Sequence, residues 1–299
     1  MTKRRRGKRG LGLVLLLAAA ALGVWLALTR PVDATDLPDH TPKPQSSSAA
    51  QAEPLSEALT AAVLSPPVRR SRAEALQYLR GLDATDALLA AALENEAACP
   101  DALLISLANN PELAPFAAAY PGGGASGGYT QAELDGAHPL LLQWDPRWGY
   151  ETYGSGPLAL TGCGPTCLAM AALALTGDES ATPDRVAAYS ERKGYYSKGD
   201  GTKWLLFSQG AADFGLRVEE LPLWEASMTQ ALDAGKQIVC CVGGGDFTSD
   251  GHFILLYGYS ADGFLVNDPN SRLRSAEAWP YDRLSGQISN LWALSREEA

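Results

Sequence analysis

Residues 162–166 read Gly162-Cys163-Gly164-Pro165-Thr166 and open an apolar stretch that continues to residue 175. Proline suits the first turn of a helix, because the N–H that it lacks would have no partner there. The sequence therefore predicts a helix that begins at this motif, with Cys163 at or just before its N-terminus. The partial positive charge at that end of a helix favours a thiolate over a thiol, which makes Cys163 a candidate nucleophile.

The chain contains only three histidines, so few residues are candidates for the base that activates this nucleophile. His252 opens a stretch of alternating apolar residues, and Asp268 follows on the next predicted strand. A five-residue hairpin loop at 258–262 would place His252 directly opposite Asp268, where the carboxylate would orient the imidazole and stabilise its charged form. A two-residue turn at Ala261-Asp262 or at Asp262-Gly263 would instead shift the register and separate the pair.

The remaining cysteines have simpler interpretations. Cys167 lies one helical turn after Cys163 and is predicted to face the core. Cys240 and Cys241 are adjacent in an apolar stretch, so they point to opposite faces of a predicted strand. Five cysteines, two of them adjacent, indicate no disulfide framework and no set of zinc ligands. We therefore expect no metal or cofactor. His138, beside a glycine-rich stretch, is expected to be a surface residue and not a base.

The N-terminal end carries an unusual distribution of charge. Residues 1–10 contain six basic residues and no acidic one, whereas the whole chain has a formal net charge of −10. The acidic remainder argues against nucleic acid as a partner. Residues 11–29 contain no charge and are long enough to span a bilayer as a helix.

Residues 1–30 therefore predict a cytoplasmic basic stretch followed by a transmembrane signal anchor. Because positive flanks stay in the cytoplasm, the rest of the chain would lie outside the cell, at the membrane surface. The alternative is a signal peptide whose cleavage would release a secreted protein.

Changes in composition divide the rest of the chain. Residues 31–54 are rich in Pro, Ser and Ala and predict a linker. Residues 55–120 are rich in Ala and Leu, with a capping box at 71–74, and predict a small helical segment with a structural or docking role. Residues 121–136 form a Gly-rich linker.

We expect residues 137–299 to form one α+β domain, because predicted helices come first and predicted antiparallel strands follow. The predicted strands are residues 216–221, 237–242, 252–259 and 264–267.

Four motifs of this region together resemble those of papain-like cysteine peptidases. They are, in order, Gln143-Trp144-Asp145, Gly162-Cys163-Gly164-Pro165-Thr166, Gly251-His252-Phe253-Ile254 and Val266-Asn267-Asp268-Pro269. Within that class, they are most similar to the bacteriocin-leader (double-glycine) processing peptidases and their stand-alone relatives. The resemblance covers residues 137–290.

The resemblance implies a papain-like fold and a role for each matching residue. Cys163 would be the nucleophile, His252 the general base and acid, and Asp268 the orienting group. Gln143 would donate its side-chain amide to the oxyanion, together with the backbone N–H of Cys163.

The expected activity is hydrolysis of peptide or amide bonds in a peptide or protein substrate, through a thioester intermediate. Two alternatives stay open. One is a catalytically silent, surface-anchored module that binds a peptide or a cell-wall component. The other is a cell-wall peptide hydrolase or transpeptidase, which would cleave or exchange cross-link peptides.

Overall fold

The computed structural model describes residues 55–82, 86–122 and 127–297. All of them belong to one compact unit, His40–Ala299. The predicted membrane segment at 11–29 and the linker at 31–54 lie outside the described residues. Within those residues, no helix has both the length and the apolar character needed to cross a bilayer.

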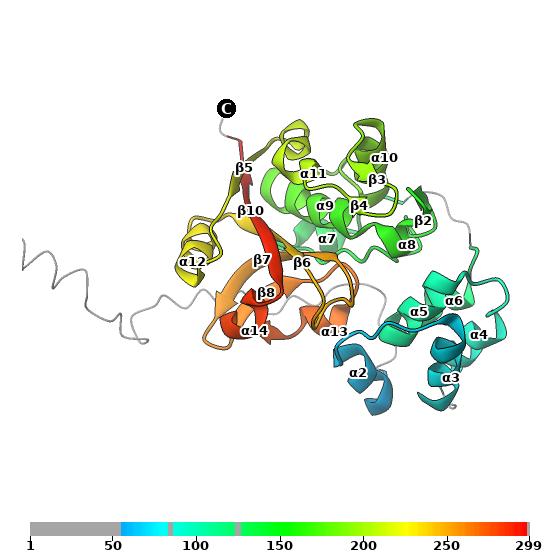
Figure 1. The fold of residues 1–299 in the computed structure, drawn as a ribbon. Helices are drawn as coiled ribbons and strands as arrows, with labels where there is room; N and C mark the ends of the chain where they lie inside the picture. The colour runs from blue at the N-terminus through cyan, green and yellow to red at the C-terminus, as the bar shows by residue number, and fades with distance from the viewer. Residues whose placement is uncertain (1–54, 83–85, 123–126, 298–299) are drawn as a thin grey trace, which may run out of the picture. The chain divides into compact units, whose positions relative to one another are not determined.

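Short helices make up the first part of the described chain (Figure 1). They are α2 (Glu57–Leu64), α3 (Arg72–Leu82), α4 (Ala87–Glu94), α5 (Asp101–Asn109), the 3-10 helix η1 (Pro111–Leu113) and α6 (Ala114–Ala118). The predicted capping box is present, because the Ser71 N–H donates to the Glu74 carboxylate at 2.7 Å and the Glu74 N–H donates to Ser71 Oγ at 3.3 Å. Buried leucines of these helices pack with Leu142 and Trp144 in one hydrophobic cluster. The helices therefore share a core with the region that follows them.

The second part is built on a six-stranded antiparallel sheet with the order β5-β10-β6-β7-β8-β9. The strands are β5 (Leu216–Glu220), β6 (Gln237–Val242), β7 (His252–Ser260), β8 (Gly263–Asn267), β9 (Ala278–Trp279) and β10 (Ile288–Arg296). The sequence predicted β5 to β8 but not β10, which inserts between β5 and β6. Residues 291–294 of β10 are buried in succession, so this strand lacks the alternation of a half-exposed strand.

Helices and short strands complete this part. They are α7 (Gln131–Asp135), α8 (Leu158–Thr161), α9 (Cys163–Thr176), α10 (Pro183–Arg192), α11 (Leu205–Ser208), the 3-10 helix η2 (Gly210–Phe214), α12 (Glu225–Asp233), α13 (Arg272–Ser275), α14 (Tyr281–Ser285), β1 (Thr152–Tyr153), β2 (Gly156–Pro157), β3 (Tyr196–Ser197) and β4 (Gly201–Thr202). This mixture of helices and an antiparallel sheet confirms the predicted α+β class.

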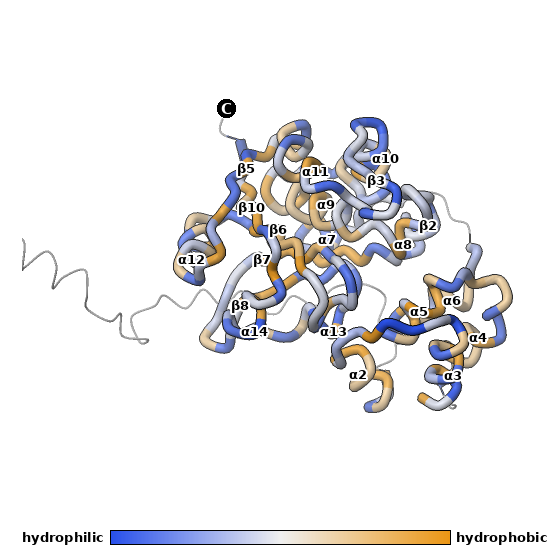
Figure 2. The backbone as a smooth tube through the Cα atoms, in the orientation of Figure 1, coloured by the Kyte–Doolittle hydropathy of each residue, from blue (hydrophilic) through white to orange (hydrophobic). Residues whose placement is uncertain are grey.

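The sheet is covered on both faces. Leu255 of β7 and Trp292 of β10 belong to a cluster that includes most of α9, whereas their neighbours Ile254 and Leu291 belong to another cluster with Met228 of α12. Successive strand residues point to opposite faces, so the two clusters lie on opposite sides of the sheet. Helix α9 lies beside α10 and α11 (Figure 1), and its path in Figure 2 is mostly apolar. The helix that begins at Cys163 is therefore held in the interior.

Candidate active site

Helix α9 (Cys163–Thr176) begins at the cysteine of the Gly-Cys-Gly-Pro motif, with Gly162 as its N-cap. The half-buried Cys163 is its first residue, as predicted. Gly164 permits a close approach of the neighbouring chain, because a Cβ added there would lie 2.7 Å from Cγ2 of Thr202. The start of α9 is thus packed tightly against β4, which limits the positions that Cys163 can take.

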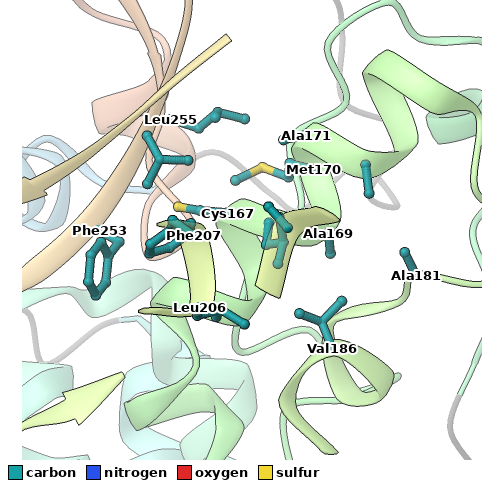
Figure 3. Close-up of a cluster of buried hydrophobic side chains, with 14 of the residues drawn as sticks. Cys167, Ala169, Met170, Ala171, Ala181, Val186, Leu206, Phe207, Phe253 and Leu255 are labelled. Atoms are coloured by element: carbon teal, nitrogen blue, oxygen red, sulfur yellow. The ribbon is translucent and has the colours of Figure 1, made fainter. Parts of the chain in front are cut away.

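The other cysteine of this helix is a core residue. Cys167 is fully buried and lies near Phe207 and Leu255 in Figure 3. Burial raises the pKa of the Cys167 thiol well above its ordinary value. Burial likewise raises the pKa of Cys240. A thiol that stays protonated is a poor nucleophile, so both side chains act as small apolar groups.

The structure brings His252 and Asp268 into direct contact. His252 Nε2 lies 2.7 Å from Asp268 Oδ1, and both side chains are buried. The same carboxylate oxygen accepts the Asn270 N–H at 2.8 Å. Because Asp268 engages Nε2, Nδ1 is the imidazole nitrogen left for another partner, and Cys163 is near enough to be among the groups that raise the pKa of His252. His252 and Asp268 therefore form a buried pair, and Cys163 lies near enough to influence the charge of His252.

Two opposing effects act on the charge of His252. Burial alone would lower its pKa, but the charge and hydrogen bond of Asp268, with a smaller contribution from Cys163, raise it to about 10. The imidazole thus holds its proton far above the ordinary value of about 6.5. A protonated imidazole beside a thiol is the arrangement that stabilises a thiolate.

The strand register that leads to this contact differs from the expected one. Ser260 pairs with Gly263, so the hairpin turn is Ala261-Asp262 and the predicted five-residue loop is wrong. A register shift between Leu256 and Gly258 then moves the pairing one residue back toward the expected register. We also expected a two-residue turn to separate His252 from Asp268, and this expectation is wrong as well.

The contact survives because Asp268 is not part of the ladder. Strand β8 ends at Asn267, and Asp268 forms an isolated bridge with Ser271 in the turn that follows. Its backbone is therefore free of the strand register, and its side chain reaches His252 from beyond the end of the strand. The expected shared face does hold for the apolar residues, since Ile254 and Val266 belong to one cluster.

Gln143 is buried and contacts both the chain segment before Cys163 and the loop that carries Asp268. Its Nε2 donates to the backbone carbonyl of Ala159 at 2.7 Å, in the short helix that precedes Cys163. Its backbone N–H donates to the carbonyl of Pro269 at 2.7 Å, next to Asp268. One N–H of the side-chain amide stays available beyond the bond to Ala159. Gln143 thus links the chain before the nucleophile to the loop of the carboxylate.

His138 differs from the surface residue that the sequence predicted. It is half-buried, its ring stacks on Tyr257 with centroids 5.0 Å apart, and Nδ1 lies 3.0 Å from Gln237 Nε2. Burial lowers its pKa, in the opposite direction to that of His252. The glycine and proline beside it in the sequence gave no sign that the ring would pack against a strand.

Sequence reasoning missed two buried charged residues near Asp268. Arg274 is 1% exposed, and its Nη1 lies 3.9 Å from Asp268 Oδ2. Glu112, from the helical segment, accepts hydrogen bonds from the Ser271 hydroxyl at 2.5 Å and from the Arg272 N–H at 3.1 Å. No motif marks these residues, because each gains its environment only when distant parts of the chain meet.

The fold and these contacts define an α+β protein with a cysteine at a helix start, a histidine on the adjoining sheet and a carboxylate just beyond the end of the next strand. Comparison with known families agrees, since the profile of the Peptidase_C39 like family matches residues 138–299. The chain belongs to this family, and it is a C39-type member of the papain-like cysteine peptidases.

The comparison with solved structures lists the peptidase domain of Streptococcus ComA, described as a bi-functional ABC transporter involved in a quorum sensing pathway. The match covers 54% of this chain and 99% of that domain, at 16% sequence identity and a TM-score of 0.38. No curated protein matches the chain.

Proposed function

We propose that this protein is a cysteine peptidase in which Cys163 is the nucleophile, His252 the general base and acid, and Asp268 the group that orients His252. The observation that carries the proposal is the buried His252–Asp268 pair, with Nε2 2.7 Å from Oδ1 and with Cys163 among the groups that raise the pKa of His252. Membership of a peptidase family supports the same chemistry. The substrate class is a peptide or a protein.

The reaction follows from the charges of the three groups. The Cys163 thiolate attacks the carbonyl carbon of the scissile amide and forms a tetrahedral oxyanion. The C–N bond then breaks, and the His252 imidazolium gives its proton to the leaving amine. Water, deprotonated by the now neutral His252, attacks the thioester, releases the acid and restores the thiolate. An amine in place of water would give transpeptidation.

We assign the oxyanion donors to the Cys163 backbone N–H and the Gln143 side chain. The backbone N–H of Cys163 is at the start of α9, where N–H groups have no partner within the helix. Gln143 keeps one amide N–H beyond its bond to Ala159. Its buried position supports this role, because a hydrogen bond is strongest where water is excluded.

For the N-terminal part we propose a single membrane-spanning segment at residues 11–29, with the peptidase region on the outer side. The support is the uncharged length of this segment and the basic residues before it. Full-length protein should stay with membranes after an alkaline wash, and its C-terminal region should be digested by protease added to intact cells. Release into the wash would favour the cleaved signal peptide.

The chemistry is tested by the rate at which iodoacetamide alkylates Cys163 in the full chain, measured by mass spectrometry. An isolated thiol ionises near pH 8.5, so fast alkylation at about pH 6.5 reports a thiolate stabilised by its surroundings. We expect Cys163 to react at that pH at least about tenfold faster than Cys241, the other half-buried cysteine. His252→Ala should abolish the difference.

Cys241 is an internal control, because both thiols are read in the same sample. Equal rates for the two cysteines, unchanged by His252→Ala, would count against peptidase chemistry. That result would favour the silent binding module. If the thiolate is present, a screen of protein substrates beside cross-linked cell-wall peptides separates the general peptidase from the cell-wall hydrolase.

A further inference from the structure

The loop after β8 has little structure of its own. Residues 268–275 contain Asp268 and the four-residue helix α13 (Arg272–Ser275). Within the loop, the Asp268 N–H donates to Ser275 Oγ at 2.8 Å, and the Ser271 N–H donates to the carbonyl of Asp268 at 3.1 Å. These bonds, and the Asn270 N–H that donates to the Asp268 carboxylate, tie the loop only to itself. Its placement depends on what packs against it.

Much of that support comes from the helical segment, about 160 residues earlier in the sequence. Asn110 is fully buried, and its Nδ2 donates to the carbonyl of Asn270 at 2.5 Å. Glu112 accepts from the Ser271 hydroxyl at 2.5 Å and from the Arg272 N–H at 3.1 Å. Asn110 also orders Glu112, because its Oδ1 accepts the Glu112 N–H at 3.1 Å. Asn110 and Glu112 thus hold the three successive loop residues 270–272.

The same carboxylate also balances a buried charge. Arg274 lies against Asp268, and burial lowers its pKa while the negative charges of Asp268, Glu112 and Asp246 oppose that effect. Burial raises the pKa of Glu112, opposed by its hydrogen bond to Ser271 and by Arg272. Without the negative charge of Glu112, Arg274 would attract Asp268 Oδ2 more strongly. Asp268 would then turn away from His252, which competes for the same carboxylate.

We infer that Asn110 and Glu112 are positioning residues for Asp268. The helical segment then contributes to the geometry of the active site. They contact neither the substrate nor Cys163. Glu112 acts through Ser271 and Arg272, by setting the place of Asp268, and through Arg274, by balancing its charge. The helical segment then has a function that its sequence, read as a structural or docking module, did not reveal.

This inference rests on the proposed function, because it concerns the chain from Asp268 through His252 to Cys163. The test is Glu112→Gln in the full chain, with alkylation of Cys163 by iodoacetamide as the readout. We expect the rate at about pH 6.5 to fall about tenfold, because a displaced Asp268 stabilises the His252 imidazolium less well. At about pH 10 the rate should equal that of the unmodified chain, since a thiol is ionised there without help.

The matched control is Glu96→Gln. Glu96 is also in the helical segment and pairs with Arg80 at 2.5 Å. Within the described part of the chain, none of its hydrogen bonds or ion pairs reaches the loop at 268–275. We expect its rate to stay within about twofold at both pH values, because surface ion pairs contribute little. A merely structural effect of Glu112→Gln would change the melting temperature and expose the thiol at every pH. It would not slow alkylation at low pH alone.

A second variant guards against failure of Glu112→Gln to fold. Asn110→Ser removes the bond to Asn270 but leaves a side-chain oxygen that can cap η1, and it should produce the same low-pH loss. If His252→Ala slows alkylation while Glu112→Gln behaves like Glu96→Gln, this inference fails and the proposed function stands. If His252→Ala has no effect, the proposed function fails and the inference falls with it. If neither variant folds, the two residues are structural and the inference is overturned.

Discussion

Cys163 and Asp268 are both held in place, but by different means. Cys163 is the first residue of a 14-residue helix that is buried for most of its length, so local sequence sets its position. Asp268 is the first residue after a strand, in a loop held by Gln143 from one region and by Asn110 and Glu112 from another. The nucleophile is thus placed by its own element, and the carboxylate by its neighbours.

Each part of the site is therefore sensitive to a different kind of substitution. A change near Cys163 acts through the packing of α9, which has a whole hydrophobic cluster behind it. A change near Asp268 acts through a few hydrogen bonds and charges, each replaceable by a single substitution. Single substitutions near Cys163 and near Asp268 therefore separate the two kinds of support.

Asp268→Asn has the largest expected effect, because it removes the carboxylate that contacts His252. In the native chain His252 has a pKa of about 10, so its proton is kept until the pH approaches that value. Asn removes the largest effect that raises this pKa and leaves burial, which lowers it, so the proton should be lost near pH 6.5 or below. Titration of the imidazole by NMR measures this directly. His138, whose pKa is already lowered by burial, is the internal reference and should not move.

Retention of a His252 titration near pH 10 in Asp268→Asn would mean that Asp268 does not set the charge of the site. Cys163 and the charge of His252 would then both depend only on the packing around α9, and the difference between the two kinds of support would not hold.

Gln143→Ala tests the residue that joins the two ends. Removal of one oxyanion donor costs about 10²–10³ in turnover number, with little change in substrate affinity. The assay is hydrolysis of a peptide substrate found by screening the native chain. The control is Gln237→Ala, which removes another buried glutamine whose Oε1 also has no hydrogen-bond partner. Equal losses for both variants would reduce Gln143 to a structural residue.

The smallest expected effect is on the free energy of unfolding, through packing at the start of α9 beside Cys163. Gly164→Ala would place a methyl group 2.7 Å from Cγ2 of the buried Thr202, whose hydroxyl is fixed by Tyr153 at 2.9 Å. Overpacking of this kind costs about 1–3 kcal/mol of unfolding free energy, measured by urea denaturation.

Gly81→Ala is the matched control for that substitution. Gly81 is in helix α3, and nothing lies within 4 Å of a Cβ added there. Its replacement should stabilise the chain by up to about 1 kcal/mol, because Ala favours a helix over Gly. A Gly164→Ala variant as stable as the native chain would show that the start of α9 is less tightly packed than its contacts indicate.

Much of the site could be predicted from sequence because its signals are local. A glycine pair, a proline and an apolar stretch set the start of α9, and a run of apolar residues indicated β7, whose first five residues are buried without alternation. The hairpin register could not be predicted, because a two-residue turn and a register shift differ from a longer loop by only small energies. Strand β10 was missed, although its residues 291–294 are buried in succession like the first five residues of β7.

The sequence by itself determined the class of fold, the helix that presents Cys163 and the strand that begins at His252. The helix makes its hydrogen bonds within one short segment, and the strand is marked by a local run of apolar residues. Only the tertiary structure decided that Asp268 meets His252 and that Glu112 stands behind it. Ser271 and Glu112 are separated by 159 positions. Their contact exists because two hydrophobic surfaces pack together, and no local pattern records which residues such packing brings into contact.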